Sequence, residues 1–477
     1  MAWNPEFEAA FDPKAVAIVG ASTEESEMNL NFTRALQVLG YQGHLYPVNR
    51  KATEDTKICG LKAYPSLVSI PEHIDLVVVS VPKHAIVDVL NDCIAAGAKN
   101  VQMFTAGFRE TGEREGIELE DRIVQIAREN GLNVVGPNCM GVYSPKARVG
   151  LFQDSSTVPG PVAFLSQSGG LMGEFAGLGS EYGIYFSKAV SFGNAAVMDS
   201  TDFLEYLATD PETTIITMYL EGVNKGRLFT EQVKEINKTK PVIIWKGGLT
   251  ESGSRAVASH TGSLGGQEET WQAFFRQTGA VRVDSLDELR DVTMTFLYLP
   301  PPKGRRVALM GAGGGNSVAG ADVCAREGLT VPPIAEETRR RLATFVPPDG
   351  TSVGNPLDIG VALRDANLLS QALEPVAADP AIDAIIYDFA VGLLVLGMGD
   401  AREGMIKYMV DFAKGNAHGT PLIMVIHRWV SGKGVVNEMH ELLARFVGDG
   451  VAAYQSLQRA SRAYAKFVGY HEFHGRI

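Results

Sequence analysis

The stretch AVAIVG, residues 15–20, begins a series of five short apolar runs in the first third of the chain. It is followed by HLYPV (44–48), DLVVVSVP (75–82), NVQMF (100–104) and LNVVG (132–136), with longer stretches between them that suit amphipathic helices. Runs that are apolar throughout are typical of strands buried on both faces of a parallel sheet. We therefore predict an α/β fold that opens with a doubly wound, Rossmann-like domain.

The alternation of strand, glycine-rich turn and helix continues through the rest of the chain. A second series contains PVAFLS (161–166), TTIITMYLEG (213–222) and PVIIWKGG (241–248). A third contains RVALMG, DAIIYDF and PLIMVIH, and it follows LYLPPPKGRR (297–306), which has the composition of a linker. These series predict three domains, at residues 1–150, 151–300 and 301–477.

The composition is that of an ordinary globular protein, because 45% of the 477 residues are hydrophobic and 21% are charged. A formal net charge of −12 without a basic block argues against nucleic acid or an anionic membrane as partner. The four cysteines are far apart and lack metal-ligand spacing, which predicts a reducing compartment, no disulfide framework and no metal on this chain. We find no signal-peptide core or membrane-spanning run and predict a cytoplasmic protein.

Three small-residue loops follow predicted strands. In FLSQSGGLMGEF (164–175), backbone N–H groups and serine hydroxyls at a helix start could bind phosphate, although an ordinary capped helix start has the same pattern. SFGNAAVMDS (191–200) leads into a helix that we expect to start near Asp199. GAGGGNSVAGAD (311–322) lacks the Lys-Ser/Thr ending of a nucleotide P-loop and is interpreted mainly as a tight turn.

The first strand lacks the glycines of a dinucleotide-binding turn. GASTEESEMN (20–29) has only Gly20 where a G-x-G-x-x-G pattern would place three glycines. This weakens the interpretation as an NAD-dependent oxidoreductase, while a ligand held differently at the same sheet edge stays open.

His260 lies in AVASHTGSLGG (256–266), a stretch rich in small residues. Because the stretch is poor in helix formers, we predict a mobile loop. The loop supplies neither partners for a metal site nor large neighbours for a packed histidine. Two interpretations stay open, namely an exposed histidine without a role and a nucleophile that takes and releases a phosphoryl group near pH 7.

Four motifs together, GPNCMG (136–141), FLSQSGGLMG (164–173), YLEG (219–222) and SHTGSLGG (259–266), resemble the α subunit of the NDP-forming acyl-CoA synthetases. The resemblance is to the ADP-forming acetyl-CoA synthetases and, more distantly, to succinyl-CoA synthetase. It implies a Rossmann-like CoA-binding domain followed by two flavodoxin-like domains with parallel sheets.

By this resemblance His260 is the phosphoryl carrier, and Glu221 is the carboxylate that orients its imidazole. The phosphate site would consist of Ser168, Gly169, Gly170 and Asn194. The CoA site would be lined by Ser22, Lys51, Val81, Pro82, Thr105, Asn138 and Cys139. Cys139 is interpreted as a wall of the thioester end rather than as a nucleophile. The acidic, glycine-free TEESEMNLN (23–31) departs from the family pattern near Ser22.

Nothing after residue 300 resembles an ATP-grasp domain. The resemblance therefore implies that ATP or ADP, with Mg, binds to a separate ATP-grasp β subunit in an α2β2 assembly. The chain would interconvert acyl-CoA, ADP and phosphate with a carboxylic acid, CoA and ATP, through acyl phosphate and phosphohistidine. The alternative is a regulatory protein that binds CoA or acyl-CoA without catalysis.

Overall fold

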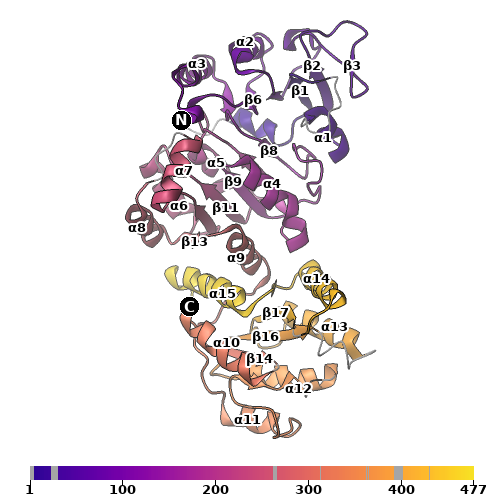
Figure 1. Cartoon of the computed structure of the whole chain (residues 1–477), viewed down its shortest axis with the longest axis vertical. Coiled ribbons are helices and arrows are strands. Elements are labelled where there is room, and N and C mark those ends of the chain that lie inside the picture. Colours follow the sequence, from indigo (N-terminus) through magenta and orange to yellow (C-terminus); the bar gives the residue numbers. More distant parts are fainter. Residues whose placement is uncertain are drawn as a thin grey trace. The chain divides into compact units, whose positions relative to one another are not determined.

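The computed structural model describes residues 5–22, 31–261, 266–311, 313–360, 363, 365–391, 401–428 and 430–477, and the side chains of residues 5 and 258–261 lie outside this description. The chain forms two compact units, Met1–Ser180 with Ile184–Leu286, and Glu181–Gly183 with Asp287–Ile477. The first unit contains two large sheets and the second contains one (Figure 1).

The first sheet has the strand order β2-β1-β5-β6-β7, and all its strands are parallel. Each of the five predicted apolar runs forms one of these strands. The strands are β1 (Ala15–Val19), β2 (His44–Val48), β5 (Leu76–Val79), β6 (Asn100–Met103) and β7 (Asn133–Val135). The connections contain α1 (Phe32–Leu39), the hairpin β3 (Lys57–Ile58) and β4 (Leu61–Lys62), α2 (Ile86–Ala95) and α3 (Arg114–Asn130).

Helix α2 shows why these connections are helical. Ile86, Leu90 and Cys93 recur at helical spacing, and all three are fully buried. They belong to the same core as Val77 and Val79 of β5. Helices α2 and α3 contact each other, as Figure 1 shows. The predicted doubly wound α/β domain is confirmed.

The second sheet has the order β13-β12-β11-β9-β10-β8, in which β8 alone is antiparallel to its neighbour. Its strands are β8 (Gly141–Tyr143), β9 (Val162–Ser166), β10 (Phe186–Ser191), β11 (Ile215–Leu220), β12 (Val242–Lys246) and β13 (Val281–Val283). Its helices are α4 (Gly169–Leu178), α5 (Ser200–Thr209), α6 (Gly226–Ile236), α7 (Glu251–Thr261) and α8 (Glu268–Thr278). The sequence predicted β9, β11 and β12, whereas it missed the other three. Helix α5 begins as predicted, because Asp199 is its N-cap and accepts a hydrogen bond from the N–H of Thr201.

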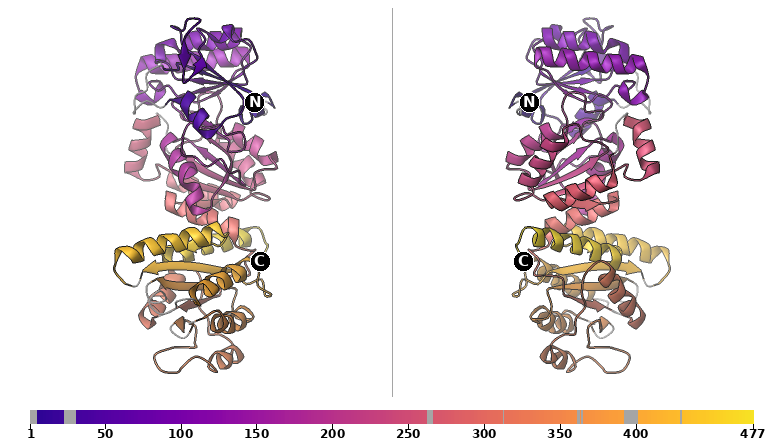
Figure 2. Two further views of the ribbon diagram at one scale, coloured as in Figure 1. Left: turned by 90° about the vertical axis from the view of Figure 1, so that its right-hand side faces the viewer. Right: turned by 90° about the vertical axis from the view of Figure 1, so that its left-hand side faces the viewer.

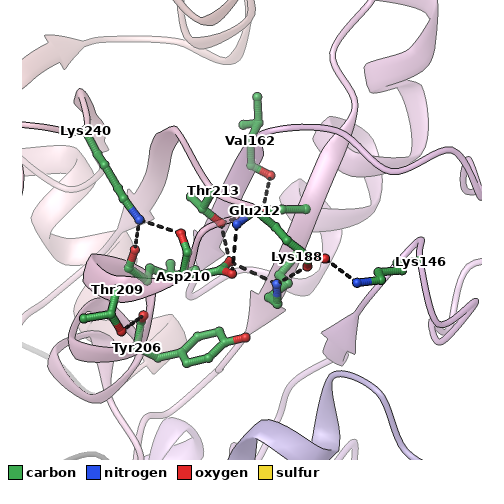
Figure 3. A network of polar contacts seen from close by, with 11 residues as sticks. Lys146, Val162, Lys188, Tyr206, Thr209, Asp210, Glu212, Thr213 and Lys240 are labelled. Atoms are coloured by element: carbon green, nitrogen blue, oxygen red, sulfur yellow. Dashed lines mark hydrogen bonds and ion pairs between the residues drawn. The ribbon is translucent and has the colours of Figure 1, made fainter.

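A buried lysine stabilises the second sheet (Figure 3). The Nζ of Lys188, in β10, lies 2.9 Å from Asp210 Oδ2 and 2.7 Å from Glu212 Oε2. The Lys188 side chain is only 7% exposed, and Asp210 also accepts a hydrogen bond from Thr213 Oγ1 at 2.7 Å. Burial opposes the charged form of Lys188, but its bonds to Glu212 and Asp210 outweigh burial and raise its pKa.

The third sheet, in the second unit, is parallel and has the order β15-β14-β16-β17-β18. Its strands are β14 (Val307–Gly311), β15 (Leu357–Asp358), β16 (Ala384–Val391), β17 (Leu422–Arg428) and β18 (Ala453–Tyr454). The helices are α9 (Leu286–Tyr298), α10 (Gly314–Arg326), α11 (Glu336–Leu342), α12 (Ala366–Ala377), α13 (Ala401–Lys414), α14 (Lys433–Gly448) and α15 (Leu457–Phe473). Figure 2 shows α15 running along this sheet, where it contacts β16, β17, β18 and α10.

Candidate functional site

The order of parallel strands reverses once in each sheet, which is the pattern of doubly wound flavodoxin-like domains. The reversal lies between β1 and β5 in the first sheet and between β9 and β11 in the second. Ligands of open α/β sheets bind outside the carboxyl ends of the strands at this point. The predicted CoA residues lie at the first of these edges, and the predicted phosphate residues with Glu221 lie at the second.

Turns from three strands meet at the carboxyl edge of the first sheet. The Thr105 hydroxyl, after β6, donates a hydrogen bond to the Val81 carbonyl, after β5, at 2.7 Å. The N–H of Asn138, after β7, donates to the Thr105 carbonyl at 2.9 Å. The structure therefore brings together three residues that the sequence assigned to one ligand.

The turn after β1 lies against the turn after β5. Gly20 has φ +92°, and a Cβ there would lie 2.1 Å from the main-chain oxygen of Ser80 and 2.9 Å from Val81 Cγ1. The close approach requires glycine, both for its left-handed backbone and for the missing side chain. Ser22 is half-buried beside this contact, and Pro82 is exposed.

Lys51 is exposed in the turn after β2. Its main-chain N–H donates to Asn49 Oδ1 at 2.9 Å, and the Asn49 amide donates to the Ala21 carbonyl at 2.8 Å. These bonds fix the turn of Lys51 next to that of Ser22. The lysine side chain is accessible to an anion at the sheet edge.

Cys139 is a buried thiol rather than a reactive one. It is 3% exposed, and its Sγ donates to the main-chain oxygens of Met103 and Val135, each at 3.4 Å. Burial raises the pKa of this thiol to about 12. This environment agrees with the interpretation of Cys139 as part of a wall.

The predicted phosphate loop joins β9 to α4. Ser168 is the N-cap of α4, and its hydroxyl accepts a hydrogen bond from the N–H of Leu171 at 3.3 Å. The Ser166 hydroxyl donates to the Ser168 carbonyl at 2.7 Å and fixes the turn. Gly170 is exposed at the start of the helix. Helix N-termini of this kind attract anions through unpaired N–H groups and the helix dipole.

This loop packs directly against the turn that contains Cys139. A Cβ on Gly169 would lie 2.7 Å from Met140 Cγ. The Met140 N–H donates to Ser191 Oγ, at the end of β10, at 3.1 Å. The predicted thioester end and the predicted phosphate loop are therefore adjacent.

The contacts of Asn194 do not support its predicted role in phosphate binding. Asn194 Nδ2 donates to Glu110 Oε2 at 2.6 Å and to Glu120 Oε2 at 2.9 Å, so both amide hydrogens are bonded to carboxylates. Its Oδ1 accepts from Asn138 Nδ2 at 3.4 Å. Two carboxylates beside this amide disfavour an anion, so these contacts do not favour a role in phosphate binding, and that role stays a prediction.

Glu221 is 5% exposed directly after β11, and three side chains hold it. Its main-chain N–H donates to Gln167 Oε1 at 2.5 Å, and its carbonyl accepts from Lys246 Nζ at 2.9 Å. Its Oε1 accepts from the Tyr219 hydroxyl at 3.2 Å. Because Gln167 precedes Ser168, the phosphate loop and Glu221 are linked through one residue.

The prediction of a mobile loop around His260 is wrong for residues 256–261, which complete α7. Thr250 Oγ1 accepts from the N–H of Gly253 at 3.0 Å, and Arg255 pairs with Glu251 one turn earlier at 2.5 Å. Val257 is buried, and α7 contacts the 3₁₀ turn Arg109–Thr111. Capping and packing therefore compensate for poor helix formers. The His260 side chain and residues 262–265 lie outside the described residues.

Sequence reasoning missed Gln167, Tyr219, Lys246 and Glu110. Lys246 had a usable signal, since it is a lone charged residue at the end of an apolar strand. Its Nζ donates to the main-chain oxygens of Glu221 and Gly247. Glu110 had none, because its partner Asn194 is 84 residues away in sequence.

The third sheet has polar residues at the same edge. Most of the stretch GAGGGNSVAGAD (311–322) belongs to α10, and the N–H of Gly313 donates to Asp358 Oδ1 at 2.7 Å directly before this helix. Residue 312, in the predicted tight turn, lies outside the described residues. His427 Nδ1 lies 2.6 Å from Asp388 Oδ1, and this contact raises the pKa of His427 against the effect of burial. A cavity of about 500 Å³ borders His427 and Arg428.

Within the described ranges, no group of three or more His, Cys, Asp or Glu side chains could hold a metal ion. In the same part of the chain, every helix is too short or too polar to cross a bilayer.

Residues 14–145 match the CoA binding domain family, and residues 159–296 match the succinyl-CoA ligase like flavodoxin domain. The second acetate–CoA ligase [ADP-forming] α subunit of Pyrococcus furiosus is 38% identical over 459 residues, 95% of this chain and 96% of that one. The first acetate–CoA ligase [ADP-forming] of Archaeoglobus fulgidus is 36% identical over 380 residues, which are 80% of this chain and 54% of that one.

The solved structure of "dinucleotide forming Acetyl-coenzyme A synthetase 1" of Candidatus Korarchaeum cryptofilum, with phosphate and ADP, has a TM-score of 0.84 at 30% identity. The match covers 98% of each chain. The fold and the two adjoining sheet edges thus define a chain that combines a CoA-binding domain with a succinyl-CoA ligase-like domain. It belongs to the family of ADP-forming acetate–CoA ligase α subunits, within the NDP-forming acyl-CoA synthetases.

Proposed function

We propose that this chain is the α subunit of an ADP-forming acid–CoA ligase, which interconverts acyl-CoA, ADP and phosphate with a carboxylic acid, CoA and ATP. The observation that carries the proposal is the contact between Gly169 and Met140. It places the helix start that suits phosphate against the turn of Cys139, at the edge that suits CoA. An acyl group at this contact would face both reactants of a thioester phosphorolysis.

The first step joins phosphate to the acyl group. A phosphate oxygen attacks the thioester carbonyl, the C–S bond breaks, and the CoA thiolate leaves with the electron pair. The N–H groups that start α4 and the Ser168 hydroxyl hold the phosphate in this step. Thr105, Val81 and Asn138 form the wall along the pantetheine, and Lys51 binds a CoA phosphate. The half-buried Val81 and Asn138 and the exposed Lys51 at this edge fit such a ligand.

The second step forms phosphohistidine. The imidazole of His260 attacks phosphorus, a P–N bond forms, and the carboxylate leaves as the P–O bond breaks. Glu221 accepts a hydrogen bond from the other ring nitrogen and stabilises the positive charge on the ring. Phosphohistidine then transfers its phosphoryl group to the terminal phosphate of ADP.

The nucleotide, with Mg, binds to an ATP-grasp β subunit in an α2β2 assembly. One finding supports a separate partner, because a relative that is 38% identical over 95% of this chain and 96% of its own length is named as an α subunit. We also propose three domains, at residues 1–150, 151–300 and 301–477. Each contains most of one large sheet, and β8 (Gly141–Tyr143), which precedes the first boundary, joins the second sheet. All four cysteines are free thiols, which supports the proposal of a cytoplasmic location.

The test is phosphorylation of the purified chain by acyl-CoA and ³²P-labelled phosphate. We expect label that is lost in acid, as phosphohistidine is, and no label in His260→Ala. The chain alone should form no acyl-CoA from acid, ATP and CoA, and addition of the β subunit should restore turnover for one member of a panel of acids. Acid-stable label, or undiminished label in His260→Ala, would refute the assignment of the carrier.

A further inference from the structure

Each polar main-chain group of Glu221 is held by a side chain from a neighbouring segment. Gln167, before α4, accepts hydrogen bonds from the N–H groups of Glu221 and Gly222 at 2.5 and 2.9 Å. Lys246, at the end of β12, donates to the carbonyl of Glu221 at 2.9 Å. Glu221 therefore follows its strand in one fixed conformation rather than in a free turn.

The Glu221 carboxylate is held as well. The Tyr219 hydroxyl donates to Oε1 at 3.2 Å. Burial and the nearby Glu221 raise the pKa of Tyr219, so the hydroxyl stays protonated and remains a donor. Tyr219, which lies in β11 two positions before Glu221, thereby sets the direction of the carboxylate.

Burying the charged side chain of Lys246 costs more free energy than a purely structural hydrogen bond would justify. It is 5% exposed, and within the described residues its Nζ bonds to main-chain oxygens, those of Glu221 and Gly247. The Nζ also lies 5.3 Å from the centroid of the Trp271 ring. Burial lowers the pKa of Lys246 to about 8, against the opposing charge of Glu221. A buried cation without a carboxylate in contact is unfavourable for stability, which points to a functional reason for keeping it.

We propose that Lys246 and Tyr219 are positioning residues that act on phosphoryl transfer through Glu221. The inference rests on the proposed function, because it concerns the carboxylate that orients the carrier histidine. Lys246 fixes the main chain of Glu221 and places a positive charge next to its carbonyl oxygen. Tyr219 fixes the direction of the Glu221 carboxylate. With either residue lost, Glu221 samples orientations that do not meet the imidazole, and the rate falls while CoA binding persists.

The experiment measures single-turnover phosphohistidine formation by the assembled enzyme, from acyl-CoA and ³²P-phosphate. Tyr219→Phe removes one hydroxyl and should lower the rate constant about tenfold, without a change in the KM for acyl-CoA. In a Glu221→Gln background the same substitution should change the rate less than twofold, because the oriented charge is already gone. An equal loss in both backgrounds, or a loss of CoA affinity in calorimetry, would overturn the proposal.

Lys246→Met should lower the same rate constant by at least tenfold. Lys240→Met is the matched control, because Lys240 Nζ also donates to two main-chain oxygens, those of Leu207 and Asp210, each at 2.7 Å. Burial lowers the pKa of Lys240 as it does that of Lys246. Both substitutions should lower the thermal midpoint, but only Lys246→Met should slow phosphorylation. Equal slowing by both would overturn the role of Lys246.

These outcomes differ from a failure of the proposed function. If wild-type enzyme forms no acid-labile label, the proposed function fails. If wild-type enzyme forms the label and the Tyr219 effect is equal in both Glu221 backgrounds, only the positioning role fails.

Discussion

Asn194 donates a hydrogen bond from its side-chain amide to Glu110, with 2.6 Å between Nδ2 and Oε2. The bond joins the loop after β10 of the second sheet to the 3₁₀ turn between β6 and α3 of the first domain, across 84 residues of sequence. Burial opposes the charge of Glu110, but this bond and those from the N–H groups of Gly107 and Phe108 lower its pKa below the ordinary value. One amide thus stabilises a carboxylate at the junction of the two sheets within the first unit.

We predict that Asn194→Asp destabilises the first unit by about 2–3 kcal/mol at pH 7, because it replaces a donor with a third carboxylate beside Glu110 and Glu120. Asn224→Asp is the control, since the exposed Asn224 donates only one long bond, 3.4 Å, to the Ala195 carbonyl. Urea denaturation should show a much smaller loss for the control.

The effect of Asn194→Asp should also depend on pH. The new carboxyl has a raised pKa in the folded state, so the folded variant binds more protons than the unfolded chain, and its stability rises as the pH falls. In wild type the lowered pKa of Glu110 has the opposite sign, since its stabilisation is lost at acid pH. The gap between the two proteins should narrow from pH 7 to pH 5, and a constant gap would contradict the electrostatic explanation.

We predict that Lys188→Met destabilises the protein by roughly 3–5 kcal/mol, because it leaves Asp210 buried without its cation. The side chains of Lys188 and Asp210 are 7% and 3% exposed. Lys146→Met is the matched control, since Lys146 pairs with Glu212 of the same network but is 64% exposed. The control should leave the denaturation midpoint close to that of wild type. Equal shifts for both lysines would show that burial does not determine the effect.

The sequence predicted the strands of the fold correctly wherever a strand is apolar along its whole length. AVAIVG, DLVVVSVP and PVIIWKGG each form one strand, because such runs are buried on both faces. The sequence missed β10 because its residues Phe186–Ser191 include Lys188, a charge that only Asp210 and Glu212 make compatible with burial. The partners that neutralise this buried charge are distant in sequence, so the local pattern of apolar residues does not reveal them.

The sequence predicted at which sheet edges the candidate site residues lie, but not which residues they contact. Motifs at strand ends located Ser168, Glu221 and Thr105 at two sheet edges, since parallel strands end on one side. The bond from Asn194 to Glu110 and the packing of α7 depend on distant segments that the sequence does not bring together. Helix propensity gave the wrong prediction at α7. Differences in helix propensity are only a few tenths of a kcal/mol per residue, and tertiary contacts outweigh them.

We predict that Gly20→Ala weakens CoA binding at least tenfold and lowers the thermal midpoint. An added Cβ would meet the Ser80 oxygen at 2.1 Å, so the turns after β1 and β5 must separate. Gly97→Ala is the control, because Gly97 has φ +71° but open space around its Cβ position. It should carry only the backbone cost of about 1–2 kcal/mol and leave CoA affinity unchanged. Calorimetry with CoA decides the matter, and unchanged affinity in Gly20→Ala would separate this contact from the CoA site.

Finally, we predict that Cys139 is chemically inert in the native enzyme. Burial raises its pKa to about 12, which disfavours the reactive thiolate, and its 3% exposure blocks reagents. Iodoacetamide should modify Cys59, which is half-buried, well before Cys139, and denaturant should make both react. Cys139→Ser retains a donor to the Met103 and Val135 oxygens, so it should form phosphohistidine from acyl-CoA and phosphate within about threefold of the wild-type rate. Loss of that label in Cys139→Ser, with CoA binding intact, would mean that the thiol attacks the acyl group before phosphate does.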